Sequence, residues 1–371
     1  MAKPKILIIG GGFAGCIATQ MLTEKNYDVT LIEKQSVLGG ACRTYWHGGH
    51  PYNLGPRHFL TRDEAVYDFL NKSCPMHRYD QGHEFLTYVE QDSSFYHFPI
   101  HQDEIGDMPD SAKIFQELAK VSGPEGARNL EEYWVHSVGE TLYGKYIDSY
   151  SKKMWGIESN TEITDFGFTP KGVALKTGSK AAWDEAISGF PLAANGYDDY
   201  FPLAVKDATV HLDTEIEEFD LEKTRVKVDG DWQYYDIIIS TISPEIVMKD
   251  AYGPLRWMGR DFLKLVLPVK KVFPDEVYFL YYANQEPFTR VVEYKKFFRA
   301  DADSPTTLLG IEVPSNKNRL YPFPMKKDQD IHQRYVDNAP DNVYWIGRNG
   351  SYRYLDVGLI IQQCMKLFKD F

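Results

Sequence analysis

The chain has 371 residues, which is enough for two or three domains that share large cores. Its formal net charge of −12 and its pI near 5.4 argue against a nucleic-acid-binding protein. Its four cysteines show no CxxC or metal-ligand spacing, and no apolar run reaches the length of a transmembrane helix. We therefore expect a cytoplasmic protein with reduced thiols, without a metal site, a signal peptide or a membrane-inserted segment.

The first apolar run predicts a nucleotide-binding strand. Residues 6–9 are all apolar, which is typical of a buried parallel strand, and glycines follow within a tight turn before a helical segment. A second apolar run, residues 29–32, ends at an acid eighteen residues after the last of these glycines. In this pattern a pyrophosphate meets the helix N-terminus and the acid accepts hydrogen bonds from a ribose. The predicted dinucleotide contacts are Gly10, Gly12, Phe13, Ala14, Gly15 and Glu33.

A second glycine pair favours FAD over NAD as the dinucleotide. Gly39 and Gly40 follow closely behind Glu33. Such a pair is typical of FAD-dependent folds, because the longer cofactor requires the chain to pass close to it again. We therefore add Lys34, Gly40 and Ala41 to the predicted cofactor contacts.

The next part of the chain predicts a helix, then strands, then a helical region. Thr61 and Glu64 have the spacing of a capping box for a helix that runs through Asn71. Residues 84–100 alternate and are rich in aromatics, which predicts strands. From residue 111 to residue 156 the pattern is helical, and its long amphipathic segment opens at 129–132.

The second half predicts long loops followed by strands. Residues 161–207 show no clear periodicity and predict long, partly mobile loops that bind substrate. Residues 208–235 predict a β-meander with a hairpin turn at Asp229-Gly230, and residues 236–241 predict a strand that returns to the nucleotide sheet. Residues 262–313 predict several further strands, including 277–282, 290–294 and 307–313, and residues 343–348 predict a last strand that precedes a closing helix.

Three motifs resemble the UDP-galactopyranose mutase family. The first runs from Asn-Leu-Glu-Glu at 129–132 to Tyr-Ser-Lys-Lys-Met-Trp-Gly at 150–156. The second is Pro-Phe-Thr-Arg-Val-Val-Glu-Tyr-Lys at 287–295, and the third is Gly-Arg-Asn-Gly-Ser-Tyr-Arg-Tyr-Leu-Asp at 347–356. With the nucleotide fingerprint, they span nearly the whole chain in the family's order.

The resemblance implies an α/β fold in which a Rossmann-like FAD-binding domain carries a helical-bundle domain and an antiparallel β-sheet domain. The expected FAD-binding domain is discontinuous, with residues 1–62, 205–252 and 338–371. The helical bundle is expected at 103–160, the antiparallel sheet at 75–102 and 260–325, and mobile substrate loops at 161–204.

The resemblance also implies an isomerase that interconverts the pyranose and furanose forms of a nucleotide sugar, either UDP-galactose-like or a variant sugar. Reduced FAD would act through a flavin N5–sugar adduct, so that the protein supplies position and charge. The expected ligand is a nucleoside-diphosphate sugar, and a homodimer is compatible with the resemblance.

The same resemblance assigns site residues. Arg290 and Tyr354 would hold the diphosphate, Asp356 would support the flavin end or a neighbouring Tyr, and Arg348 would meet the FAD pyrophosphate. The predicted substrate contacts are Tyr146, Tyr150, Trp155, Lys176, Tyr321, Arg57 and His58. Simpler readings remain: a strand-surface salt bridge for Arg290, and core packing for the aromatic residues.

The chain departs from the family pattern around the sugar and the diphosphate. The family's Gly-x-His-x-Phe-His reads Gly-Pro-Arg-His-Phe-Leu at 55–60, with Arg57 and Leu60 at the two His positions and His58 out of register. The family's loop Arg falls near Leu175, and Lys176 beside it offers only a point charge. A family Tyr corresponds to Ile187.

Two other functions are weighed against the mutase. An FAD-dependent oxidoreductase of the amine-oxidase type would have an apolar substrate cavity and no need of Arg residues for a diphosphate. A flavin-holding binding protein without turnover is compatible with the altered residues at 55–60.

Overall fold

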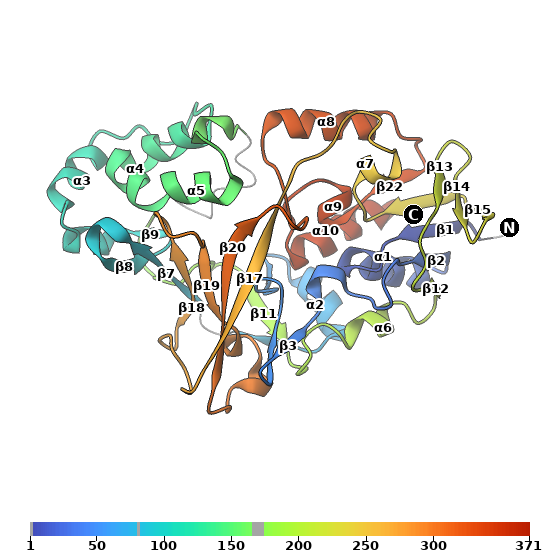
Figure 1. Ribbon diagram of the computed structural model, residues 1–371, viewed down its shortest axis with the longest axis horizontal. Helices are drawn as coiled ribbons and strands as arrows, with labels where there is room; N and C mark the ends of the chain where they lie inside the picture. Colours follow the sequence, from blue (N-terminus) through green and yellow to red (C-terminus); the bar gives the residue numbers. More distant parts are fainter. Residues whose placement is uncertain (1–2, 80–81, 165–173) are drawn as a thin grey trace.

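The computed structural model describes residues 3–79, 82–164 and 174–371. Residues 165–173, near the start of the predicted substrate loops at 161–204, therefore lie outside the described residues. Figure 1 shows a parallel sheet with its helices on one side of the molecule, three helices on the other, and a large twisted sheet between and below them.

The parallel sheet has five strands, and segments far apart in the sequence supply them. In spatial order they are β12 (Thr209–His211), β2 (Asp28–Ile32), β1 (Lys5–Ile9), β16 (Ile237–Ser240) and β22 (Val343–Trp345). Ile6 and Ile8 of β1 pack in the cluster that holds α1 (Phe13–Glu24) and α10 (Val357–Leu367), whereas Leu7 and Ile9 pack in the cluster that holds β14 (Arg225–Val228). Both faces are covered, which explains the continuously apolar run.

The second large sheet has seven strands and is antiparallel except at one pair. Its order is β21 (Tyr321–Pro322), β17 (Trp257–Leu267), β20 (Thr307–Ser315), β19 (Arg290–Glu293), β18 (Val277–Tyr282), β7 (Glu84–Val89) and β8 (Ser94–His97). The pair β7–β18 is parallel. The predicted strands within 84–100 and within 262–313 are confirmed, and both groups belong to this one sheet.

Three helices form the part of the molecule at the upper left of Figure 1, namely α3 (Ser111–Leu118), α4 (Leu130–Tyr146) and α5 (Asp148–Trp155). Asn129 caps α4, since its side chain accepts a hydrogen bond from the Glu132 amide at 2.9 Å. The apolar stripe that begins at Trp134 is buried, so the predicted amphipathic segment is confirmed. Gly139 interrupts α4 with φ +83°.

Three local predictions are corrected. Asp63 rather than Thr61 caps α2 (Glu64–Ser73), because the Asp63 carboxylate accepts from the Ala65 amide and Thr61 accepts only from the Asp63 amide. The region 161–207 contains β11 (Ile187–Pro191), which pairs with β5 (Phe59–Thr61) and β6 (Met76–Arg78). β12 leaves the predicted meander and extends the parallel sheet, so that the meander starts at β13 (Glu218–Asp220).

Shorter elements complete the fold. The strands are β3 (Tyr45–His47), β4 (His50–Tyr52), β9 (Ile100–His101), β10 (Leu175–Lys176), β13 (Glu218–Asp220) and β15 (Asp231–Tyr234). The helices are α6 (Tyr200–Ala204), α7 (Pro244–Val247), α8 (Lys326–Asp337) and α9 (Gly347–Gly350). Across the described parts of the chain, no helix is both long enough and apolar enough to cross a bilayer.

Candidate active site

A groove of about 290 Å³ runs along the carboxyl end of the parallel sheet. Nine of the predicted cofactor residues line it: Gly10, Gly12, Phe13, Ala14, Glu33, Gly40, Ala41, Arg348 and Asp356. Glu33 is held in place because its carboxylate accepts from the amides of Gly11 (2.6 Å) and Gln35 (2.7 Å). The dinucleotide motif therefore builds a preformed groove at the C-terminal edge of the sheet, where α/β folds bind nucleotides.

The groove fits a pyrophosphate. No side chain caps α1, and a Cβ added to Gly12 would meet no atom within 4 Å, so that open space lies directly before the helix N-terminus. α10 also begins at this groove, with Asp356 as its cap, accepting from the Leu359 amide at 2.9 Å. Burial raises the pKa of Asp356 above its ordinary value, although the Leu359 amide and Arg348 oppose this shift.

A second cavity of about 330 Å³ lies between α5, the seven-stranded sheet and residues 55–60. It shares six lining residues with the groove, so the two spaces meet at Pro56, His58, Arg290, Tyr321, Tyr354 and Asp356. This junction is where the reactive end of a dinucleotide cofactor in the groove would face a ligand in the second cavity. Sequence reasoning assigned five of these six residues to the site.

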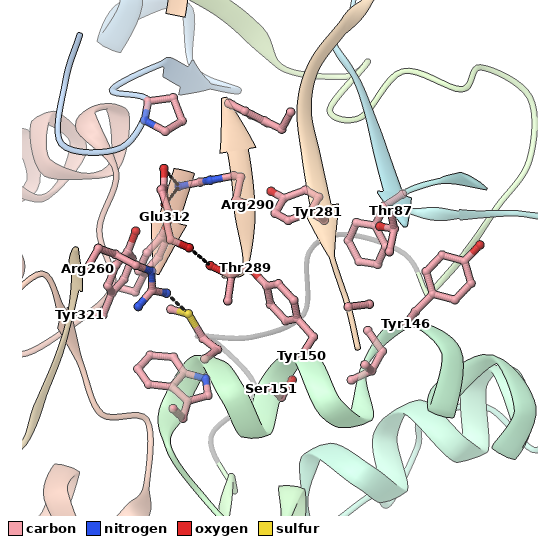
Figure 2. A pocket seen from close by; sticks show the side chains of 18 of the residues that line it. Thr87, Tyr146, Tyr150, Ser151, Arg260, Tyr281, Thr289, Arg290, Glu312 and Tyr321 are labelled. Carbon is pink, nitrogen blue, oxygen red and sulfur yellow. Dashed lines mark hydrogen bonds and ion pairs between the residues drawn. The ribbon is translucent and has the colours of Figure 1, made fainter. Parts of the chain in front are cut away.

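The strand register places charged residues in one row across the sheet. Arg290 of β19 lies opposite Tyr281 of β18 and opposite Glu312 of β20. Its Nη2 donates to both oxygens of Glu312, at 2.9 and 2.7 Å, and Glu312 is 1 % exposed (Figure 2). Burial lowers the pKa of Arg290, but Glu312 together with Tyr281 and Tyr321 outweighs burial and holds that pKa well above its ordinary value. Arg290 thus stays cationic, and its charge is offset by Glu312.

Two tyrosines stack at the junction. Tyr321 and Tyr354 have ring centroids 5.7 Å apart and an interplanar angle of 8°. Arg348 lies over Tyr354, with Cζ 4.6 Å from the ring centroid, and is fixed by donating to the carbonyls of Leu320 and Leu355. Burial raises the pKa of Tyr321, but Arg260 and the other nearby guanidinium groups bring that pKa below its ordinary value.

The helical side of the cavity carries the predicted aromatic contacts. Tyr146, Tyr150 and Trp155 all line it, and Figure 2 shows Tyr146 and Tyr150 directed from the helices toward the strands. Tyr146 is 2 % exposed, and its hydroxyl has no hydrogen-bond partner among the residues that the structure describes. A buried polar atom of this kind at a cavity wall is available to a ligand.

Four predicted residues lie elsewhere. Lys34 is exposed and pairs with Glu215 at 2.6 Å. Gly15 lines neither space, and a Cβ added to it would meet the Gly10 carbonyl at 2.0 Å. Gly15 therefore serves helix–strand packing. Lys176 also lines neither space and pairs with Asp184 at 2.8 Å. Arg57 lines the groove rather than the second cavity, and its Nε donates to the Ala41 carbonyl.

His58 lies at the junction, and a buried chain of hydrogen bonds connects it to the interior. Its Nε2 lies 2.7 Å from the Ser188 Oγ, which lies 3.1 Å from Nε2 of His83. Burial lowers the pKa of His58 well below its ordinary value, with a contribution from His83, and lowers that of His83 to about 3. Both rings are therefore neutral near pH 7.

Two charged residues of the cavity were missed by sequence reasoning. Glu312 and Arg260 both line it and both lie in strands, and Arg260 is 3 % exposed. The available signal was a charged residue at an inward position of an apolar strand, since such a charge is rarely buried without a function or a partner.

Comparison with known proteins agrees with this geometry. The family model for UDP-galactopyranose mutase matches residues 145–354, more than half of the chain, and a model for an NAD(P)-binding Rossmann-like domain matches residues 8–73. The chain belongs to the UDP-galactopyranose mutase family. It is therefore an enzyme of the UDP-galactopyranose mutase type, an isomerase of nucleotide sugars with a flavin-binding fold.

Individual members of the UDP-galactopyranose mutase family match the chain along its whole length. A dTDP-fucopyranose mutase of Escherichia coli is 25 % identical over 98 % of this chain and 97 % of its own. A probable UDP-galactopyranose mutase of Klebsiella pneumoniae is 21 % identical over 100 % of this chain and 95 % of its own. The crystal structure of a reduced UDP-galactopyranose mutase superposes with a TM-score of 0.83 at 16 % identity, and the match covers 100 % of this chain and 94 % of that one.

Proposed function

We propose that the protein is an FAD-dependent mutase that interconverts the pyranose and furanose forms of a nucleoside-diphosphate sugar. The observation that carries the proposal is the junction of the two spaces at Arg290, Tyr321 and Tyr354. A cofactor that enters the groove with its pyrophosphate at α1 would direct its ring toward this junction. A sugar diphosphate in the second cavity would meet the ring there.

The chemistry proposed for the cofactor is nucleophilic: when bound and reduced, the flavin would offer N5 to the anomeric carbon of the sugar. The protein residues hold the ligand and its charge. Arg290 and Tyr354 would donate to the diphosphate, whose negative charge grows as the glycosidic bond breaks. Tyr146 would offer its free hydroxyl to the nucleoside end, and Asp356 keeps the N-terminus of α10 in place beside the flavin.

The lining favours a sugar with an apolar position 6. Leu60, which stands at a family His position, lines the second cavity together with Trp183 and Phe279. Fucose lacks the 6-hydroxyl group of galactose, so its methyl group would find apolar contacts without leaving a polar group unpaired. The E. coli dTDP-fucopyranose mutase also has the higher identity of the two mutases compared above. We therefore rank a 6-deoxyhexose above galactose.

The competing amine-oxidase type of function finds less support. That reaction needs an apolar cavity, whereas this cavity is lined by two guanidinium groups, those of Arg260, which is buried, and of Arg290, whose side chain is 16 % exposed. Buried cations are costly, and an anionic ligand is the simplest reason for having them.

The test measures isomerisation with the flavin oxidised and with the flavin reduced by dithionite. Purified holoenzyme is incubated with dTDP-fucopyranose, UDP-galactopyranose or a GDP-hexose, and the furanose product is quantified by chromatography. We expect turnover only with reduced enzyme, no net consumption of reductant, and the highest kcat/KM with dTDP-fucopyranose. Equal turnover by the oxidised enzyme, or stoichiometric oxidation of the substrate, would contradict the proposal. A preference for UDP-galactopyranose would contradict the ranking of the sugars.

A further inference from the structure

Arg260 is a buried cation at the wall of the second cavity. It lies in β17, is 3 % exposed, and points from the sheet toward the same space as Arg290 and Tyr321 (Figure 2). The register places it on the cavity face, because Phe262 pairs with Glu312 and Arg260 stands two residues earlier on the same strand.

The partners of the Arg260 guanidinium carry no charge. One Nη donates to the carbonyl of its own neighbour Gly259 at 2.6 Å, and the other contacts the thioether sulfur of Met154 (Figure 2). Its Nε has no hydrogen-bond partner in the described chain, and its Cζ lies 4.7 Å from the centroid of the Tyr321 ring. A thioether is a poor acceptor, so most of the donor capacity of this side chain is unused.

Three other arginines nearby have acidic partners. Arg256 pairs with Asp328, Arg319 with Glu245 and Arg290 with Glu312. No Asp or Glu in the described ranges forms an ion pair with Arg260. A charge that is removed from water without a counterion lowers stability. An arginine of this kind is therefore expected where an anionic ligand supplies the counterion.

We propose that Arg260 is the second cation for the diphosphate of the substrate, beside Arg290. The identity of the anion rests on the proposed function. Because Glu312 offsets the charge of Arg290, a diphosphate that contacted Arg290 alone would meet a nearly neutral pair. Arg260 supplies the missing positive charge from a strand, with the planar fork that phosphate oxygens fit.

This assignment replaces the expected role of Lys176. The Lys176 ammonium group is bound by Asp184 and by the Ala181 carbonyl, and Lys176 lines neither space. The function that the family gives to a loop residue is thus taken over by a residue fixed in the sheet, which is oriented before the ligand arrives.

The experiment titrates the FAD-loaded, oxidised protein with UDP, dTDP, UMP and dTMP by calorimetry, for the wild type, Arg260→Met and Arg260→Lys. We expect Arg260→Met to weaken binding of the diphosphates about ten- to hundredfold, the range for a lost charge-assisted hydrogen bond. Binding of the monophosphates should change less than threefold. The diphosphate affinity of Arg260→Lys should lie between those of the wild type and Arg260→Met, because Lys keeps the positive charge but lacks the planar guanidinium fork. The control Lys176→Met should bind like the wild type.

A stability measurement separates a binding role from a structural one. Without ligand, Arg260→Met should have a thermal midpoint equal to or above that of the wild type, because an unpaired buried charge is removed. Arg256→Met should lower the midpoint, since it leaves the buried carboxylate of Asp328 unpaired.

Two outcomes would overturn the assignment: unchanged diphosphate affinity, whatever the thermal midpoint, or equal losses of affinity for mono- and diphosphates. Failure of the wild type to bind either diphosphate would instead contradict the proposed function.

Discussion

At the scale of single residues, the Arg290–Glu312 ion pair sets the charge that the protein presents at the junction of the two spaces. Glu312 is 1 % exposed, so removal of Arg290 alone leaves a buried carboxylate that repels a diphosphate as well as removing a donor. A charge-assisted pair left half-made typically costs on the order of 2–5 kcal/mol. We therefore expect Arg290→Ala to lower kcat/KM of the reduced enzyme by roughly two to three orders of magnitude.

The double variant Arg290→Ala/Glu312→Gln separates folding from function. It removes the unpaired carboxylate, so it should recover most of the thermal stability lost in Arg290→Ala and little of the activity. FAD content, read from the visible absorbance, controls for misfolding. Near-wild-type kcat/KM in Arg290→Ala would mean that the ligand is not a diphosphate held by this row of residues.

At the scale of elements, the break in helix α4 depends on a glycine, Gly139. Gly139 has φ +83°, and a Cβ there would come within 2.7 Å of the Glu117 side chain, which accepts hydrogen bonds from Thr141 just beyond the break. Gly139→Ala should therefore lower the free energy of unfolding by about 1–3 kcal/mol.

A second glycine in the same helix provides the matched control. A Cβ on Gly144 would meet no atom within 4 Å. Gly144→Ala should leave stability unchanged or raise it by about 0.4–1 kcal/mol. Urea unfolding of both variants checks this pair, and equal midpoints for the two variants would contradict the assignment of strain to Gly139.

At the scale of the whole molecule, buried histidines make stability depend on pH. His58 precedes β5, Ser188 lies in β11, and His83 precedes β7, so their hydrogen bonds join the three-stranded sheet to the seven-stranded one. Burial lowers the pKa of both rings, that of His83 to about 3. The unfolded chain then binds more protons than the folded protein below the unfolded pKa of about 6.5, and stability falls as pH falls through this window.

The variant His83→Gln tests this dependence. Each neutral buried His costs about 1.4 kcal/mol for each pH unit below 6.5, so at pH 5 the contribution of His83 is about 2 kcal/mol. Urea unfolding at pH 7.5 and pH 5 should show a smaller loss of stability in His83→Gln than in the wild type by about that amount. The exposed His47, changed to Gln, is the control and should keep the wild-type loss. Equal losses in all three proteins would contradict the prediction.

The sequence by itself determined the cofactor groove, because the motif is local. Gly10, Gly12 and Glu33 belong to one strand–helix–strand unit, in which glycine geometry and a fixed spacing predict where a pyrophosphate and a ribose would bind. The apolar run of β1 likewise predicts a strand covered on both faces, whatever covers them. The family motifs at 150–156, 287–295 and 347–356 located four residues that line the second cavity, namely Tyr150, Trp155, Arg290 and Tyr354.

Only the tertiary structure decided which charges line the second cavity. Arg260, Arg290 and Tyr321 come from three strands, and their neighbourhood depends on a register that no local pattern contains. Lys176 was assigned to the diphosphate from its position in the chain, yet its ammonium group forms an ion pair with Asp184, only eight residues away. A charged residue acts on a ligand through what remains of its charge after its protein partners are counted, and those partners are fixed by packing.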